Sequence, residues 1–159
     1  MVTPDWFVTR TRNPPYDPVN LVFYGKASSA HVSRLLRRRL RPRWHRYGLG
    51  RWVADLALGA SLWGQRRHIR VYDCLPGDED PAGQPLGTWS VATAHLEHFD
   101  LRRRTHLIDS WNEPREYLKA ALAALGPGYV GKITDADHGA AGWYHGRWFD
   151  GVVTFIELV

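Results

Sequence analysis

A histidine close to arginines marks the segment RRHIRVYD at residues 66–73. If the segment is a β-strand, alternate side chains point to the same face, and His68 and Arg70 lie about 7 Å apart. In such a pair the guanidinium can bind an anionic group while the imidazole transfers a proton near neutral pH. The alternative interpretation is a surface strand whose polar face contacts only water.

A second segment, RRTHLIDSWNEPREYL at residues 103–118, combines His106, Asp109 and Arg115. His106 and Asp109 have opposite parity, so they share a face only if the strand ends between them. Asp109 then orients the imidazole, as a carboxylate does in many acid–base sites, or it caps the turn before the helix. Arg115 falls in the first helical turn, where the helix dipole disfavours a cation. We therefore expect it to bind Asp109, a ligand or neighbouring glutamates.

Metal binding requires a separate argument, which begins from His95, His98, His106 and Asp109. Imidazole nitrogens and carboxylate oxygens suit zinc or manganese. However, positions 95 and 98 point to opposite faces of a strand, and the helical HExxH spacing is not found. The sequence also lacks G-x-S-x-G, Walker and G-x-G-x-x-G motifs. We expect metal-free chemistry without a cofactor; if a metal is bound, these four residues are the predicted ligands.

Tryptophan is unusually frequent, with eight copies in 159 residues. Each indole needs packing and a partner for its N–H, so this number fits an aromatic-lined cavity as well as a core. The strand predicted at 88–95 places Trp89 and His95 on one face. The glycine-rich loop at 135–151 adds His145 and Trp148, which are suited to cover a pocket. The alternative is that the stretch GRWFDG at residues 146–151 forms a hairpin turn.

The order of the predicted elements indicates an α+β fold. After an irregular arm at residues 1–18, β-favouring runs predict strands at 19–25, 68–75, 88–95, 104–109, 129–134 and 151–158. Helical spacing of apolar residues predicts helices at 29–41, 51–63 and 112–125. Because helices and hairpins are mixed without strict alternation, we expect a single domain at 19–159. It should hold a mostly antiparallel mixed sheet with two to three helices packed on one face.

Positive charge is concentrated at residues 34–51, in a chain with 18 arginines, three lysines and a net charge of +5. The aromatic residues there could stack on nucleic-acid bases, or the stretch could contact an anionic membrane surface. Its leucines form a core-facing stripe, so we favour a solvated helix face and regard nucleic-acid binding as the weaker interpretation. The single cysteine and the absence of an apolar leader predict a cytoplasmic protein.

Four stretches, DPVNLVFYG, RHIRVYD, THLIDSWNEPREYL and FDGVVTFIEL, together resemble the LssY C-terminal domain family over residues 17–158. The helix start is one residue shorter here than in the family pattern. The family often occurs at the end of membrane proteins, so the resemblance implies a free-standing member and suggests phospholipid-related chemistry by analogy. The positions that match are His68, Arg70, Trp89, His106, Asp109, Glu113, Arg115 and Glu116.

Together these patterns predict a small enzyme that uses acid–base catalysis on an anionic or carbonyl-containing small molecule, by phosphoester hydrolysis or by rearrangement. The predicted catalytic residues are His68, His106 and Asp109. The predicted ligand-binding residues are Arg70, Trp89, His95, Arg115, His145 and Trp148. Two alternatives stay open: a non-catalytic module that binds an anionic ligand or lipid headgroup, and nucleic-acid binding through residues 34–51.

Overall fold

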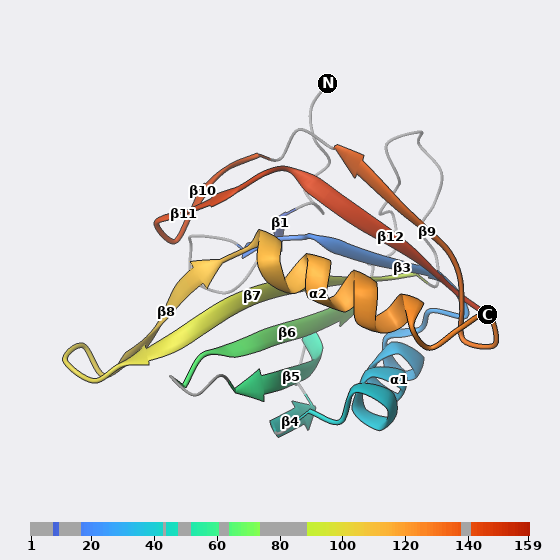
Figure 1. The fold of residues 1–159 in the computed structure, drawn as a ribbon, viewed down its shortest axis with the longest axis horizontal. Coiled ribbons are helices and arrows are strands. Elements are labelled where there is room, and N and C mark those ends of the chain that lie inside the picture. Colours follow the sequence, from blue (N-terminus) through green and yellow to red (C-terminus); the bar gives the residue numbers. More distant parts are fainter. Residues whose placement is uncertain are drawn as a thin grey trace.

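The computed structural model describes residues 8–9, 17–42, 44–47, 52–60, 64–73, 89–137 and 141–159. It is a mixed structure with more strand than helix (Figure 1). Most of the irregular arm and the loop expected at 75–87 lie outside the described residues. Neither of the helices in the described part of the chain is long and apolar enough to cross a membrane.

One large, mostly antiparallel sheet organises the chain, with its strands in the order β4-β5-β6-β7-β3-β12-β9 and with β8 paired to β7. Two small ladders, β1 with β2 and β10 with β11, stand apart from it. The strands are β1 (Val8–Thr9), β2 (Asp17–Pro18), β3 (Leu21–Gly25), β4 (Trp44–Tyr47), β5 (Trp52–Ala60), β6 (Arg66–Asp73), β7 (Ser90–Asp100), β8 (Thr105–Ser110), β9 (Val130–Asp137), β10 (Gly142–Tyr144), β11 (Arg147–Phe149) and β12 (Val152–Leu158).

The parallel pair in this sheet joins β3 to β12, and it lies between β7 and the edge strand β9. β3 also pairs antiparallel with β7, and β12 pairs antiparallel with β9. Gly25 ends β3 with a positive φ of 83°, and a Cβ there would lie 2.5 Å from the carbonyl oxygen of Leu158. A side chain is therefore excluded where β3 and β12 end together.

Helices α1 (Ser29–Leu40) and α2 (Asn112–Ala123) contribute to one hydrophobic core. Leu36 of α1 and Leu118 of α2 are buried in the same cluster as Ile69 and Val71 of β6. Residues at the intervening positions of β6 therefore point to the other side of the sheet. A second cluster on that side contains Trp111 and other buried apolar residues, among them Val19, Val22, Tyr72, Val91, Phe149 and Val153.

The helix predicted at 51–63 is wrong, because Trp52–Ala60 form strand β5, paired between β4 and β6. Three successive side chains, Leu56, Ala57 and Leu58, are all buried. A strand covered on both faces carries apolar residues at every position, so its pattern resembles that of a buried helix.

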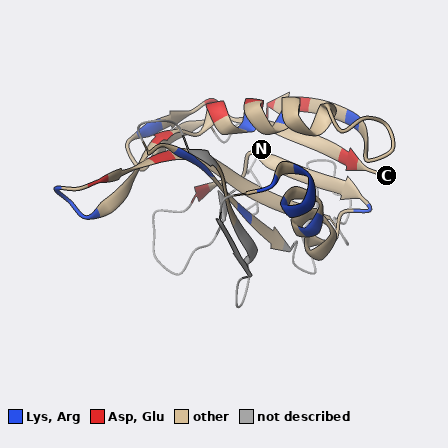
Figure 2. Cartoon of the chain, turned by 60° about the horizontal axis from the view of Figure 1, so that its bottom comes forward, with Lys and Arg blue, Asp and Glu red and all other residues tan. Residues whose placement is uncertain are grey.

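Cations collect at two separate places (Figure 2). One is α1, which holds four of the eight arginines of the basic stretch at 34–51. The other is the turn of the projecting β7–β8 hairpin, with three consecutive exposed arginines at 102–104. The aromatic side chains of 44–47, which the sequence suggested for base stacking, lie outside the described side chains.

Candidate functional site

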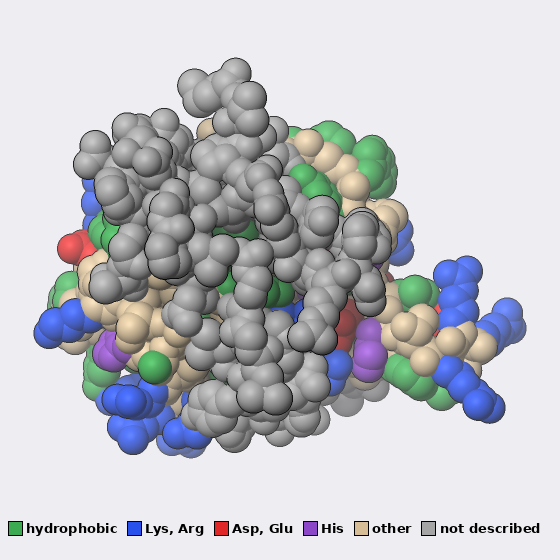
Figure 3. Space-filling view, turned by 180° about the vertical axis from the view of Figure 1, so that it is seen from behind, with side chains coloured by type: hydrophobic (Ala, Val, Ile, Leu, Met, Phe, Trp, Pro, Cys, Tyr) green, Lys and Arg blue, Asp and Glu red, His purple; other side chains and the backbone are tan. Residues whose placement is uncertain are grey.

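A cavity of about 640 Å³ opens on the face of the sheet opposite the helices. In Figure 3, which shows this face, histidine, cationic and acidic side chains meet at the base of the β7–β8 hairpin. Four of the chain's eight histidines contribute to the cavity. Its lining residues are Asp17, Arg66, His68, Arg70, His95, Glu97, His106, Leu107, Ile108 and His145.

Strand register explains why so many ionisable groups converge. His68 of β6 lies directly opposite His95 of β7, and Arg66 lies opposite Glu97. Because both strands alternate with a period of two, these four side chains and that of Arg70 project from the same face. The neighbouring position, Arg67, projects toward α2, where it binds Glu113.

Three of these side chains, which we call the buried trio, are His68, His95 and Glu97. They are 8%, 8% and 4% exposed. Nε2 of His95 lies 2.7 Å from Oε2 of Glu97 and 3.2 Å from Nδ1 of His68. Nδ1 of His68 lies 3.7 Å from the same carboxylate oxygen. Three side chains able to offer lone pairs therefore meet at one buried point.

Burial and hydrogen bonding set the charge states within the buried trio. Burial lowers the pKa of His95 below its usual value, although the hydrogen bond to Glu97 acts in the opposite direction. Burial alone would raise the pKa of Glu97, but its interactions with His68 and His95 outweigh that effect and hold the pKa well below its usual range. Glu97 is therefore ionised at neutral pH, and the imidazole of His95 is neutral.

Arg66 and His106 surround the second oxygen of Glu97. Nε of Arg66 donates to Oε1 of Glu97 at 2.5 Å, and Nδ1 of His106 lies 3.7 Å from the same atom. Nη2 of Arg66 also lies 3.5 Å from Nε2 of His106. The side chain of His106 is 45% exposed, so it can reach a molecule that enters the cavity.

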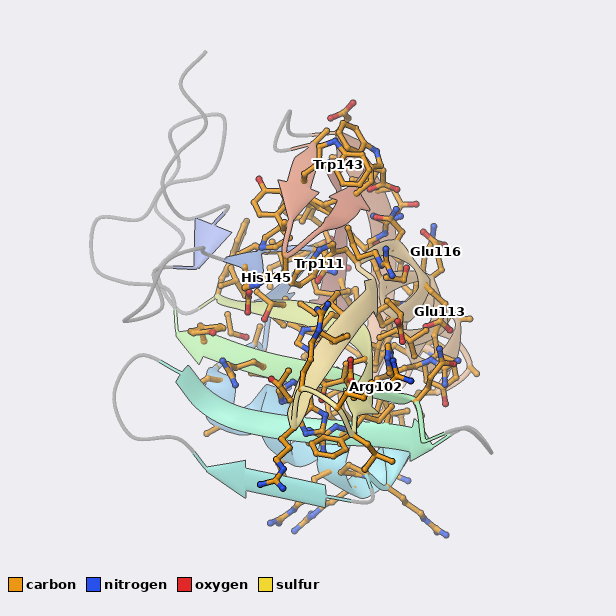
Figure 4. All side chains as sticks on the ribbon, turned by 90° about the vertical axis from the view of Figure 1, so that its left-hand side faces the viewer. Arg102, Trp111, Glu113, Glu116, Trp143 and His145 are labelled. Atoms are coloured by element: carbon orange, nitrogen blue, oxygen red, sulfur yellow. The ribbon has the colours of Figure 1, made fainter. Side chains whose placement is uncertain are left out.

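A second histidine–carboxylate pair, His145 with Asp17, lies at the edge of the cavity. Nε2 of His145 is 2.9 Å from Oδ1 of Asp17. His145 and Gly146 form the two-residue turn between β10 and β11, with φ values of 50° and 75°. The ring of His145 packs on Trp111 (Figure 4). The ring of Trp111 also contacts those of His95 and Tyr144. The hairpin turn therefore lies at 145–146 and carries a cavity residue, whereas the middle of the stretch 146–151, which was the alternative turn, forms β11.

Asp109 does not lie with His106, contrary to the sequence-based expectation. Strand β8 continues to Ser110, so parity sends Asp109 to the helix side of the sheet. There both carboxylate oxygens lie 2.8 Å from Nδ1 of His98, and Gln65 donates to one of them at 3.1 Å. The four residues predicted as ligands if a metal is bound are therefore divided between two faces of the sheet. Of these four, only His95 and His106 line the cavity.

Arg115 was expected to bind Asp109, a ligand or glutamates, and its main partner is Asp150. The guanidinium is 4% exposed and donates to both carboxylate oxygens of Asp150, at 2.6 and 2.8 Å. It also donates to the carbonyl of Val152 and to Glu116. Arg115 joins the start of α2 to the β11–β12 connection and is not among the cavity-lining residues. Figure 4 shows Glu113 and Glu116 on the α2 side, away from His145.

Both predicted ligand-binding tryptophans also lie elsewhere. Trp89 packs on Tyr24, at the margin of the second apolar cluster. Trp148 is 49% exposed on β11 and packs against Trp143 across the hairpin. Neither side chain lines the cavity. Among the described tryptophans, it is Trp111 that packs against the cavity histidines.

Sequence reasoning missed four participants. Arg66 and Glu97 have a detectable signal, because each lies two positions from a predicted histidine on the same strand face. Asp17 comes from the arm expected to be irregular, where β2 pairs with β1. Nothing in the sequence pattern singles out Trp111, because its contacts depend on how the start of α2 packs against the β10–β11 hairpin. No known protein family, curated protein or solved structure matches this chain.

Proposed function

We propose that the cavity is the active site of a small enzyme that acts by acid–base catalysis on a small molecule with an anionic group. The observation that carries this proposal is the convergence of four histidines, two arginines and two carboxylates on one cavity. Titratable groups that gather in a cleft indicate a functional site, and an imidazole is the side chain suited to proton transfer near neutral pH.

Within this proposal, the accessible histidines transfer protons. His106 and His145 are partly exposed, and each lies near a carboxylate that can orient its ring, Glu97 for His106 and Asp17 for His145. His68, which the sequence put forward as a catalyst, is instead buried beside His95 and Glu97. Arg66 and Arg70 supply guanidinium donors for the anionic group of the substrate, although the carboxylates of Asp17 and Glu97 balance their charge.

Phenyl phosphate is a suitable probe, because it combines an anionic group with a small apolar ring that fits a cavity of this volume. Binding can be followed by the fluorescence of tryptophan, since Trp111 packs against two cavity histidines. We expect Arg70→Gln to weaken binding about tenfold, the equivalent of one charge-assisted hydrogen bond. Arg67→Gln is the matched control, because Arg67 lies on the same strand and projects from the other face.

Turnover is tested with a panel of aryl phosphates and aryl esters. We expect His145→Ala to lower kcat by about 100-fold or more while phenyl phosphate binding is retained. Equal binding by the Arg70 and Arg67 variants would contradict the anion site. Specific binding without any turnover would instead identify a non-catalytic module that binds an anionic ligand through the same residues.

A further inference from the structure

We propose that the buried trio, His68, His95 and Glu97, binds a divalent transition-metal ion such as zinc at the floor of the cavity. This deepens the proposed function and uses the same cavity, but it does not involve the residues to which proton transfer was assigned. The argument rests on donor geometry, on rigidity and on the charge of the cavity.

Donor geometry is the first support. The three donor atoms form a triangle with sides of 2.7, 3.2 and 3.7 Å. Bonds of about 2.0–2.1 Å to zinc place neighbouring ligand atoms about 3 Å apart. A cation slightly above the plane of the triangle therefore reaches all three atoms with the side chains where they are. Two imidazoles and one carboxylate are also a donor set that first-row transition ions accept, with further coordination positions left for substrate or water.

Hydrogen bonds within the buried trio account for its close contacts less well than a bound cation does. Nε2 of His95 is close to both Glu97 and His68, but it carries at most one hydrogen. That hydrogen can be donated mainly to one of the two neighbours, whereas a central cation interacts with the lone pairs of all three atoms.

Rigidity is the second support. All three residues come from paired strands, and His68 and His95 are direct cross-strand neighbours. Arg66 holds the outer oxygen of Glu97 at 2.5 Å, which leaves the other oxygen to the imidazoles. Outer groups of this kind orient the ligands in known metal sites and strengthen binding. The edge of Trp111 against His95 restricts that ring further.

Charge is the third support. With neutral imidazoles, the two arginines of the lining balance the carboxylates of Asp17 and Glu97. The described lining then has no net formal charge. A divalent ion would give it a charge of about +2, which makes the cavity attractive to the anionic substrate that the proposed function requires.

Chelator-treated protein titrated with Co²⁺ and Zn²⁺ provides the test, by visible absorption and by calorimetry. We expect one equivalent of metal and a cobalt spectrum of nitrogen and oxygen ligation. His95→Ala and Glu97→Gln should weaken binding about 100-fold or more, since each removes one of three ligands. His98→Ala is the matched control, because His98 also faces a carboxylate, Asp109, but on the opposite side of β7; it should bind the metal like the wild type.

The wild-type protein gives a second readout if a variant fails to fold. With ¹⁵N-labelled histidine, Zn²⁺ should shift the ring resonances of Nδ1 in His68 and Nε2 in His95, the atoms that face Glu97. No stoichiometric binding, or an equal loss in the His98 variant, would overturn the proposal. Binding of phenyl phosphate by metal-free protein is measured separately, so the anion site can stand even if the metal site does not.

Discussion

The ion pair of Arg115 and Asp150 gives a sharp stability prediction because its partners differ in burial. The guanidinium is 4% exposed, whereas the Asp150 side chain is 34% exposed. Asp150→Asn leaves a buried cation without its main counter-charge, at a cost of about 3 kcal/mol, near the lower limit for broken buried pairs because Glu116 remains. Arg115→Met leaves a carboxylate that water can reach and keeps an apolar stem, so we expect about 1–2 kcal/mol.

Urea denaturation followed by tryptophan fluorescence measures the difference between the two variants. With a slope of about 2 kcal/mol per molar urea, the midpoint should fall by about 1.5 M for Asp150→Asn and by less than about 1 M for Arg115→Met. Equal effects, or a larger effect of Arg115→Met, would refute the reasoning from burial.

The same pair predicts how stability depends on pH. Burial raises the pKa of Asp150, but the hydrogen bonds from Arg115 and from the Val152 amide outweigh it, so the folded-state pKa lies below the usual value. A carboxyl with a depressed folded-state pKa stabilises the fold above its unfolded pKa, about 3.9, and loses this effect as the pH falls through the folded pKa. The gap between wild type and Asp150→Asn should therefore narrow below about pH 4. A gap of constant size from pH 7 to pH 3 would contradict this assignment.

Three further substitutions probe other contacts. Asn20→Asp replaces a buried amide that donates to two backbone carbonyls, and should lower the unfolding free energy by about 3 kcal/mol, measured in urea. Gly25→Ala places a Cβ against the carbonyl of Leu158 at a positive φ, and should lower the thermal midpoint by about 8 °C or more, measured by calorimetry. Asp109→Asn should leave phenyl phosphate affinity unchanged within about twofold, because its partner is His98 on the helix side; a tenfold loss would restore Asp109 to the site.

Alternation along the strands could be predicted well from the sequence. The common face of His68 and Arg70 follows from a period of two, as does the parity that separates His106 from Asp109. His106 and Asp109 lie on opposite faces because β8 extends to Ser110. The end of a strand depends on partners distant in the sequence, so this extension could not be predicted.

The pairing of β6 with β7 could not be predicted in the same way. Glu97 reaches the cavity because β7 keeps its register with β6 there, while its pairing with β8 shifts between Leu96 and Glu97. Such irregularities depend on local twist and leave no fixed pattern in the sequence. For strand β5, the apolar pattern in the sequence fits both a buried helix and a buried strand. Pairing with the neighbouring strands determines that it is a strand.

The parallel pairing of β3 with β12 has a consequence for the rate of folding. Leu21 and Thr154 are neighbours in the sheet, although almost the whole described chain separates them. Closing such a long loop costs conformational entropy before the new contacts repay it. Because β12 pairs with both β3 and β9, we expect its docking between them to be the slow step of refolding.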